Sequence, residues 1–321
     1  MPFLPNPAIK RLADLLAIGV TLAIGIAILA AQAGKAPTPL ALAETHYEKG
    51  DCQKVIETLS TYVGSQAPGD TPYWLFAECS IRLGREEDAI RALRSGVQVN
   101  PKSGILKLQL GQALFRKDPV SAEAGEMLRL ASLAAPKDPE SRHYYAQWAY
   151  LNNRDEICAR NEIEGLRAPG LADLAKLQMH TLLGMCQSRL DQTEAARASF
   201  EAARNINLRS PQFDAASAHQ HVRFLTLSGE KSEIDALVGE ILRHAPNFGP
   251  ARLERAKSFD RARNAAKAIE EAKLALEGEG ADFAIIRAAH LLLAKNYFAL
   301  GETQKAEEEQ KWVESHVTPS R

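Results

Sequence analysis

The sequence predicts an all-α protein built from repeated helix pairs. Alanine is its commonest residue and aromatic residues make up only 6% of the 321 positions, which favours closely packed helices over strands. The helix–turn–helix pattern is plainest at residues 72–101, PYWLFAECSIRLGREEDAIRALRSGVQVNP. There Trp74, Ala77 and Ile81 form an apolar row, Gly84 marks a turn, and a second apolar row follows. The hydrophobic and charged fractions, 45% and 25%, are ordinary for a globular protein and exclude wholesale disorder.

The same pattern recurs at a nearly constant interval along the chain. Successive turn positions lie 34 to 38 residues apart. The longer intervals exceed the shorter ones by about one helical turn of 3.6 residues, so the apolar face keeps its direction. The predicted turns are at Gly50, Gly84, Asp118, Asn153, Asp191, Gly229, Arg263 and Gly301.

This interval resembles that of the tetratricopeptide repeat (TPR) family, whose unit is a 34-residue helix–turn–helix. The resemblance covers about residues 38–318 in eight units. It implies a right-handed α-solenoid, which we assign to residues 40–318, with a short tail at 319–321. One such unit cannot bury both of its faces, so each repeat is expected to be stabilised by its neighbours.

Small and large residues fall where two paired helices need them. The small positions are Ala77, Gly111, Ala146, Gly184, Ala256 and Ala294 on first helices, and Ala89, Ala124, Ala196, Ala268 and Ala306 on second helices. The larger Leu93, Leu128, Phe200 and Val238 are expected to fill the space between them. Three polar residues interrupt the pattern: Gln310 fits a terminal capping helix that faces water, whereas Glu162 and Arg255 predict soft places in the stack.

The amino-terminal part carries an uncharged apolar run at residues 15–34, long enough to cross a ~30 Å hydrocarbon core as a helix. Lys10 and Arg11 precede it, so residues 1–14 are expected to be a cytoplasmic tail and the solenoid to be exported to the periplasmic side. Residues 35–39 form a spacer. Three interpretations stay open: an uncleaved anchor, a signal peptide cleaved after Ala33, which would leave a periplasmic or secreted protein, and a buried core helix.

No pattern typical of catalysis, metal binding or cofactor binding is present. The sequence lacks a phosphate-binding loop, a zinc-protease helix, a nucleophile elbow and any C-x-x-C pair, so we predict no catalytic residues, no metal and no cofactor. His219 and His221 are the only close histidine pair. Residues two apart point to different sides of a helix, so we expect one packed and one exposed imidazole.

The four cysteines form two pairs with similar separations. Cys52 and Cys79 are 27 residues apart, and Cys158 and Cys186 are 28 apart. In each pair the TPR resemblance places one cysteine on a second helix and the other on the next first helix. If the domain is exported, both pairs predict disulfides between adjacent repeats, and Cys158–Cys186 has the better helical register. The alternative is four buried thiols.

In TPR proteins the first helices line a concave groove that takes extended peptides or partner helices. By that resemblance the groove residues are Trp74, Glu78, Arg82, Gln112, Arg116, His143, Gln147, Tyr150, Arg189, Arg223, Lys257, Arg261 and Lys295. The carboxy-terminal half of this set is mostly cationic, which predicts a preference for an acidic segment. The alternative is a solvated face that only keeps the protein soluble.

These observations predict a non-catalytic protein–protein interaction scaffold or adaptor in the cell envelope, held at a membrane through residues 15–34. Its partners would be other proteins, because a net charge of −1 argues against nucleic acid. Two other functions are weighed: a periplasmic chaperone or adaptor whose signal peptide is removed, and an enzyme with a site near His143, His219 or His221. The asparagine-rich clamp for chaperone tails has no match, since Glu78, Gln112, Gln147 and Met185 occupy its positions.

Overall fold

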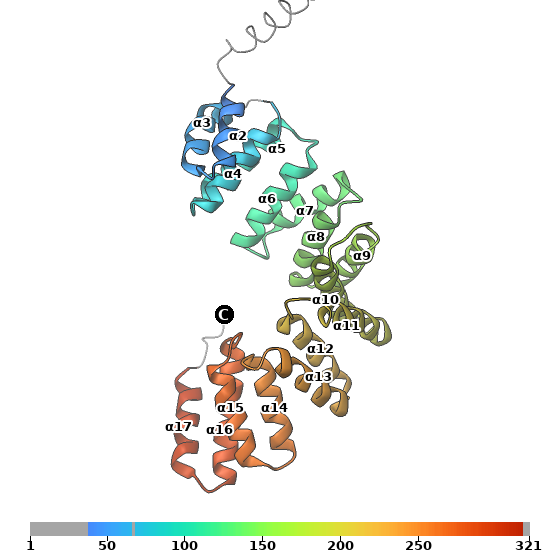
Figure 1. Ribbon diagram of the computed structural model, residues 1–321, viewed down its shortest axis with the longest axis vertical. Helices are drawn as coiled ribbons and strands as arrows, with labels where there is room; N and C mark the ends of the chain where they lie inside the picture. The colour runs from blue at the N-terminus through green and yellow to red at the C-terminus, as the bar shows by residue number, and fades with distance from the viewer. Residues whose placement is uncertain (1–37, 66–67, 317–321) are drawn as a thin grey trace, which may run out of the picture. The chain divides into compact units, whose positions relative to one another are not determined.

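A computed structural model describes residues 38–65 and 68–316 of the chain. In this part the structure is all-α: it contains sixteen helices and no strand, apart from one isolated bridge between Phe248 and Glu279 (Figure 1). The predicted cytoplasmic tail, the apolar run at 15–34 and residues 35–37 of the spacer lie outside it. Each of the sixteen helices is too short or too polar to cross a membrane.

The helices pack pairwise, as in a TPR solenoid, and the eight predicted units are confirmed as eight helix pairs. The first helices are α2 (Pro39–Glu48), α4 (Thr71–Arg82), α6 (Gly104–Lys117), α8 (Pro139–Leu151), α10 (Asp173–Arg189), α12 (Ala215–Ser228), α14 (Gly249–Arg261) and α16 (Phe283–Ala299). The second helices are α3 (Cys52–Gly64), α5 (Glu86–Val99), α7 (Ala122–Ala134), α9 (Asp155–Gly165), α11 (Thr193–Asn207), α13 (Lys231–His244), α15 (Ala265–Glu277) and α17 (Thr303–Ser315).

The predicted turn residues share one backbone conformation, with a single exception. Gly50, Gly84, Asn153, Asp191, Gly229, Arg263 and Gly301 all have φ between 55° and 80°. A left-handed residue after a helix lets the chain reverse into the next helix, which explains why glycine, asparagine and aspartate dominate these positions. The exception is Asp118, which begins a longer turn that ends at the helix-capping Ser121.

The small residues lie where paired helices approach closely, as predicted. An added Cβ on Gly184 would lie 2.9 Å from the ring of Phe200, and one on Gly111 would lie 2.7 Å from the side chain of Leu128. Ala89, Ala124, Ala196, Ala268 and Ala306 are all 0% exposed. Larger residues at these positions would push the helices of a pair apart.

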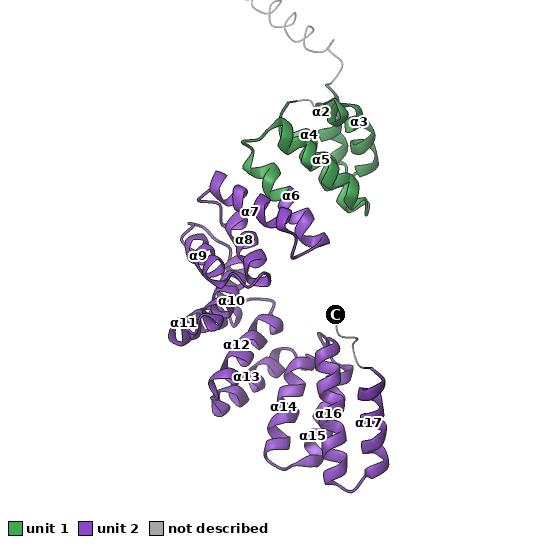
Figure 2. Cartoon of the chain, turned by 180° about the vertical axis from the view of Figure 1, so that it is seen from behind, with its two compact units in different colours: residues 1–109 green, residues 110–321 purple. Residues whose placement is uncertain are grey.

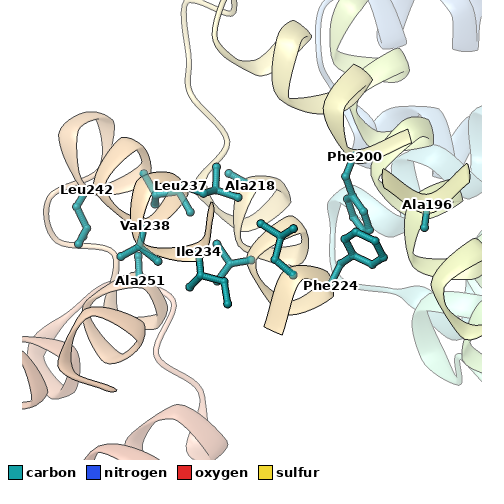
Figure 3. Close-up of a cluster of buried hydrophobic side chains, with 12 residues drawn as sticks. Ala196, Phe200, Ala218, Phe224, Ile234, Leu237, Val238, Leu242 and Ala251 are labelled. Atoms are coloured by element: carbon teal, nitrogen blue, oxygen red, sulfur yellow. The ribbon is translucent and has the colours of Figure 1, made fainter. Parts of the chain in front are cut away.

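The chain divides into two compact units, residues 1–109 and 110–321, with the boundary inside α6 (Figure 2). In the described part of the first unit, Val55, Leu59, Tyr73 and Leu93 are completely buried. The second unit contains a core that runs from α11 through α12 and α13 to α14. Figure 3 shows Phe200 of α11 facing Phe224 of α12, and Ile234, Leu237 and Val238 of α13 beside α12. Core residues shared between repeats are what a stacked architecture requires.

Two polar residues that interrupt the sequence pattern have partners on the paired helix. Glu162 is 0% exposed, and its carboxylate lies 2.6 Å from Nδ1 of His143. Arg255 Nε lies 3.2 Å from a carboxylate oxygen of Glu271. These slots are therefore filled by ion pairs or hydrogen bonds in place of apolar contacts. Gln310 is exposed on α17 and donates to Glu314, which agrees with the expected water-facing terminal helix.

Candidate partner-binding groove

Two adjoining hollows in the second unit share part of the first-helix row. The larger, about 600 Å³, is lined by α12, α14, the segment before α16, and the start of α16. The smaller, about 140 Å³, is lined by residues of α8, α10, α11 and α12. Gln220, Arg223 and Leu227 line both. We call these two hollows together the α12 groove.

The shared residues line both hollows because of their spacing on α12. Ala216, Gln220, Arg223 and Leu227 are separated by four, three and four residues, which puts them on one side of a helix. Val222 and Leu225, on the other side, are buried in the core. Asp214 accepts a hydrogen bond from the Ser217 amide at the start of this helix, and Gly229, with φ 80°, ends it. Leu227 is 82% exposed, far more than any other large apolar residue in the described chain.

Most of the predicted cationic row is neutralised by the chain's own carboxylates. Nζ of Lys257 lies 2.7 Å from Oε1 of Glu254, and Nζ of Lys295 lies 2.7 Å from Oδ2 of Asp260. A longer contact of 3.7 Å joins Arg261 to Asp235. Only Lys257 of these three cations lines the α12 groove. A general attraction for acidic segments along the whole row is therefore weaker than its count of basic residues suggests.

Arg223 differs from those three cations. Its guanidinium donates to the neutral side chain of Gln220 over 3.3 Å, and within residues 38–65 and 68–316 no carboxylate forms an ion pair with it. Arg189 faces the same smaller hollow. It lies 3.7 Å from the centre of the Tyr150 ring, donates to the Tyr150 carbonyl over 2.8 Å, and reaches Asp155 at 3.4 Å. The stacked ring and the carbonyl hold this guanidinium in place.

Both histidines of α12 are buried, so the expectation of one exposed imidazole was wrong. His219 is 9% exposed and His221 is 6% exposed. His219 lines the larger hollow, with its ring edge-on to Phe248, and His221 stacks on Phe200 with 5.3 Å between ring centres. The two histidines are two residues apart and point to different sides of α12, but both are buried because α12 packs against other helices on more than one side.

These imidazoles are kept neutral by their surroundings. Burial lowers the pKa of each to about 4. Among the described residues, three ring nitrogens have no hydrogen-bond partner: both nitrogens of His221 and Nε2 of His219. Charges of both signs surround His219, with Glu254 and Asp282 opposing Arg223 and Lys257. In the same part of the chain, no cluster of three histidine, cysteine, aspartate or glutamate side chains is placed to hold a metal ion.

The other predicted groove residues line neither hollow. Trp74, Glu78 and Arg82 belong to the first unit, where Arg82 pairs with Glu78 at 2.9 Å and lies over the Tyr47 ring. Gln112 is 9% exposed and donates to Glu140, and Arg116 is exposed near the end of α6. His143 and Gln147 hydrogen-bond to each other at 2.9 Å. Tyr150, Arg189, Arg223 and Lys257 are the predicted residues that the α12 groove contains.

Sequence reasoning missed several lining residues. Gln220, Leu227 and Glu254 are on the same helix faces as predicted residues, at helical spacings of three or four. Helical spacings of three and four residues, counted from Arg223 and Lys257, would have identified these three residues. Phe248 and Asp282 lie at the starts of α14 and α16, and no periodic signal marks them.

The two cysteine pairs differ in the structure. Cys158 of α9 and Cys186 of α10 are joined by a disulfide, with their Cα atoms 6.2 Å apart. Cys52 and Cys79 are buried free thiols. Burial and the adjacent Cys52 thiol raise the pKa of Cys79 to about 12. The oxidation of either pair in the cell stays a prediction.

No protein-family model matches this sequence, and no curated protein matches it. Solved structures do. A tetratricopeptide repeat protein from Parabacteroides merdae superposes with a TM-score of 0.57 at 12% identity, covering 79% of this chain and 97% of that one. The chain described here has a TPR fold. A chain of the APC/C hetero-tetramer Cut9–Hcn1 superposes with a TM-score of 0.53 at 13% identity, covering 87% of this chain and 53% of that one. At these identities the similarity concerns the TPR fold alone.

Proposed function

We propose that this TPR chain is a non-catalytic scaffold that holds a segment of a partner protein in the α12 groove. The observation that carries the proposal is the pair of adjoining hollows that share Gln220, Arg223 and Leu227. TPR folds generally serve as protein–protein interaction scaffolds, and a groove along first helices is where such a segment would lie.

The side chains in the groove suit recognition. Arginine and aromatic residues are common anchors at protein interfaces, and the smaller hollow holds Arg189, Arg223 and Tyr150. Leu227 leaves most of its surface in water, and covering it would release that water. A partner that contacts both hollows would therefore gain apolar burial and charge-assisted hydrogen bonds together.

The histidines give an enzyme little support. Glu162 engages Nδ1 of His143 and Gln147 engages its Nε2, so neither nitrogen is open to a substrate. His221 lies within the core beside Phe200 and Phe224. His219 reaches the larger hollow, but its lining contains no serine, cysteine or threonine other than Thr226. General acid–base chemistry needs a titratable group within reach of a reacting atom.

Site-specific photocrosslinking in cells tests the scaffold function. A photoreactive residue at Gln220 should give discrete protein adducts, and Leu227→Glu should abolish them. Leu174→Glu is the matched control, because Leu174 is 62% exposed on α10 and lines neither hollow. Absence of adducts at Gln220, or adducts unaffected by Leu227→Glu, would contradict binding in this groove.

We also propose an envelope location, on sequence grounds. The apolar run at 15–34 with Lys10 and Arg11 before it supports a membrane anchor with the solenoid on the periplasmic side, and Ala33 supports cleavage as the alternative. Membrane fractionation combined with amino-terminal sequencing separates these. A mature chain that begins at Gly34 and is released in soluble form would rule out the anchor.

A further inference from the structure

The two hollows of the α12 groove differ in charge. Among the described residues, the charged side chains that line the smaller hollow are Arg189 and Arg223, and no aspartate or glutamate lines it. The larger hollow contains Arg223 and Lys257 opposed by Glu254 and Asp282. The smaller hollow is therefore cationic, while the larger one carries balanced charge.

Nearby carboxylates do not neutralise the smaller hollow fully. Glu230 and Glu233 both pair with Arg197, and Glu240 pairs with Arg204 at 2.6 Å. Asp155 approaches Arg189 at 3.4 Å, which is a long contact. Arg223 is bound to the neutral Gln220. An incoming carboxylate would thus meet one fixed guanidinium and one without an acidic partner in the described chain.

The larger hollow has the opposite character. Leu227, Phe248 and Ile285 line it together with Ala216 and Ala284. Its volume of about 600 Å³ is within the range of sites that enclose a small ligand or a large side chain. Lys257 and Glu254 neutralise each other at 2.7 Å, and Arg223 and Asp282 carry opposite charges, so the lining has no net charge and its apolar residues distinguish it from the smaller hollow.

We propose that the partner is a peptide segment that combines two features. An aspartate or glutamate side chain enters the smaller hollow between Arg189 and Arg223, and an aliphatic or aromatic side chain a few residues away enters the larger hollow beside Leu227. This inference rests on the proposed scaffold function and specifies the chemistry of the bound segment. Charge complementarity in one hollow and apolar complementarity in the other select such a segment.

Selection from a phage library of random dodecapeptides on the full-length protein tests this inference. Enriched peptides should pair an acidic residue with a nearby leucine, isoleucine or phenylalanine. The tightest of them, labelled with fluorescein, should bind at least about tenfold more weakly to Arg223→Gln, a change equal to one charge-assisted contact. The affinity should also fall as NaCl is raised.

Matched variants separate the two hollows. Replacing the peptide's acidic residue by its amide should weaken binding to the wild type but have little further effect on Arg223→Gln. Leu227→Ser should weaken binding without removing the acidic preference, and Arg189→Gln should repeat the Arg223 effect. Lys295→Gln is the control, because Lys295 is paired with Asp260 and lines neither hollow. Circular dichroism establishes that each variant is folded.

The outcomes distinguish this inference from the scaffold function. Enrichment of peptides with no acidic preference, or equal loss in Lys295→Gln and Arg223→Gln, would overturn the proposed chemistry and leave groove binding intact. A failure to enrich any peptide, together with no adducts at Gln220 in cells, would overturn both.

Discussion

The fourth and sixth repeats both bury polar side chains, but they do so in different ways. In α8 and α9 of the fourth repeat, the buried Glu162 is paired with His143, and the buried Asn161 donates to the Ile157 carbonyl. In α12 of the sixth repeat, His219 and His221 are buried with three ring nitrogens that lack a partner among the described residues. Glu162 keeps one oxygen, Oε2, without a hydrogen-bond partner in the described chain, whereas His221 has no partner at either ring nitrogen.

Among the described residues, the fourth repeat therefore has one buried side-chain atom without a partner and the sixth repeat has three. A buried polar atom without a partner costs about 1–3 kcal/mol of folding free energy. Such departures are expected at functional sites more than elsewhere. His219 lines the larger hollow of the α12 groove, whereas Glu162 lines neither hollow. The repeat with more of these atoms is the one that carries the candidate binding site.

The largest expected effect is acid destabilisation through the sixth repeat. An unfolded imidazole takes up a proton near pH 6.5, but the folded ones do so only near their pKa of about 4. The unfolded state therefore binds more protons below pH 6.5, and stability falls as the pH falls from 6.5 through 4. Between pH 7 and pH 4, each imidazole should lower the free energy of unfolding by about 3 kcal/mol. Urea unfolding at pH 7 and pH 4 measures it.

His221→Leu serves as the comparison variant and should remove about half of that pH dependence. The charged groups that face His221 are Arg197, Arg204, Glu233 and Glu240, and they are unchanged in the variant. The fourth repeat should respond in the opposite direction, because burial raises the pKa of Glu162 and its protonation then favours folding. An unchanged pH profile in His221→Leu would refute the account of the sixth repeat.

The second expected effect concerns the disulfide, which joins α9 of the fourth repeat to α10. Cross-linking 28 residues apart restricts the unfolded chain and contributes about 3–4 kcal/mol in the chain-entropy model. Cys158→Ser in oxidised protein should lower the free energy of unfolding by that amount. Dithiothreitol should do the same to the wild type but not to the variant. Equal stability with and without reductant would show that the bond does not form.

The third effect tests the buried pair of His143 and Glu162. Glu162→Ala should cost about 3 kcal/mol of unfolding free energy, because it leaves a cavity and removes the partner of His143. The double variant His143→Leu with Glu162→Leu replaces both polar groups and should stay within about 1 kcal/mol of the wild type. A double variant as unstable as Glu162→Ala would mean that the slot requires a polar pair. Chemical denaturation measures the free energy of unfolding of the wild type, of Glu162→Ala and of the double variant.

The smallest effect lies in the turns of the same two repeats. Gly229 of the sixth repeat has φ 80°, and nothing lies within 4 Å of where its Cβ would be. Gly229→Ala should therefore cost about 1 kcal/mol from backbone strain alone. Asn153 of the fourth repeat has φ 55°, and asparagine tolerates this region, so Asn153→Gly should change stability by less than about 0.5 kcal/mol. Thermal unfolding distinguishes the two, and equal shifts would contradict this explanation.

Much of the fold could be predicted because it depends on local rules. The turn interval located all eight helix pairs, and the positions of small residues such as Gly111 and Gly184 identified the close approaches. Register along neighbouring helices was also enough to bring Cys158 beside Cys186. The candidate site was predicted in part: four of its lining residues were named in advance, but the burial of both histidines of α12, one of which lines the larger hollow, was not.

Amino-acid order alone determined which segments are helices, where they turn and which of their faces are apolar, because these properties repeat every few residues or every 34 to 38 residues. Tertiary structure alone decided which charges are neutralised. Lys295 meets Asp260 on the preceding first helix, 35 residues earlier, and His143 meets Glu162, 19 residues later. Such contacts depend on the rotamers and offsets of two packed helices, which no periodic pattern encodes. For the same reason Arg189 reaches Asp155 of another helix, whereas Arg223 has no carboxylate partner in the described chain.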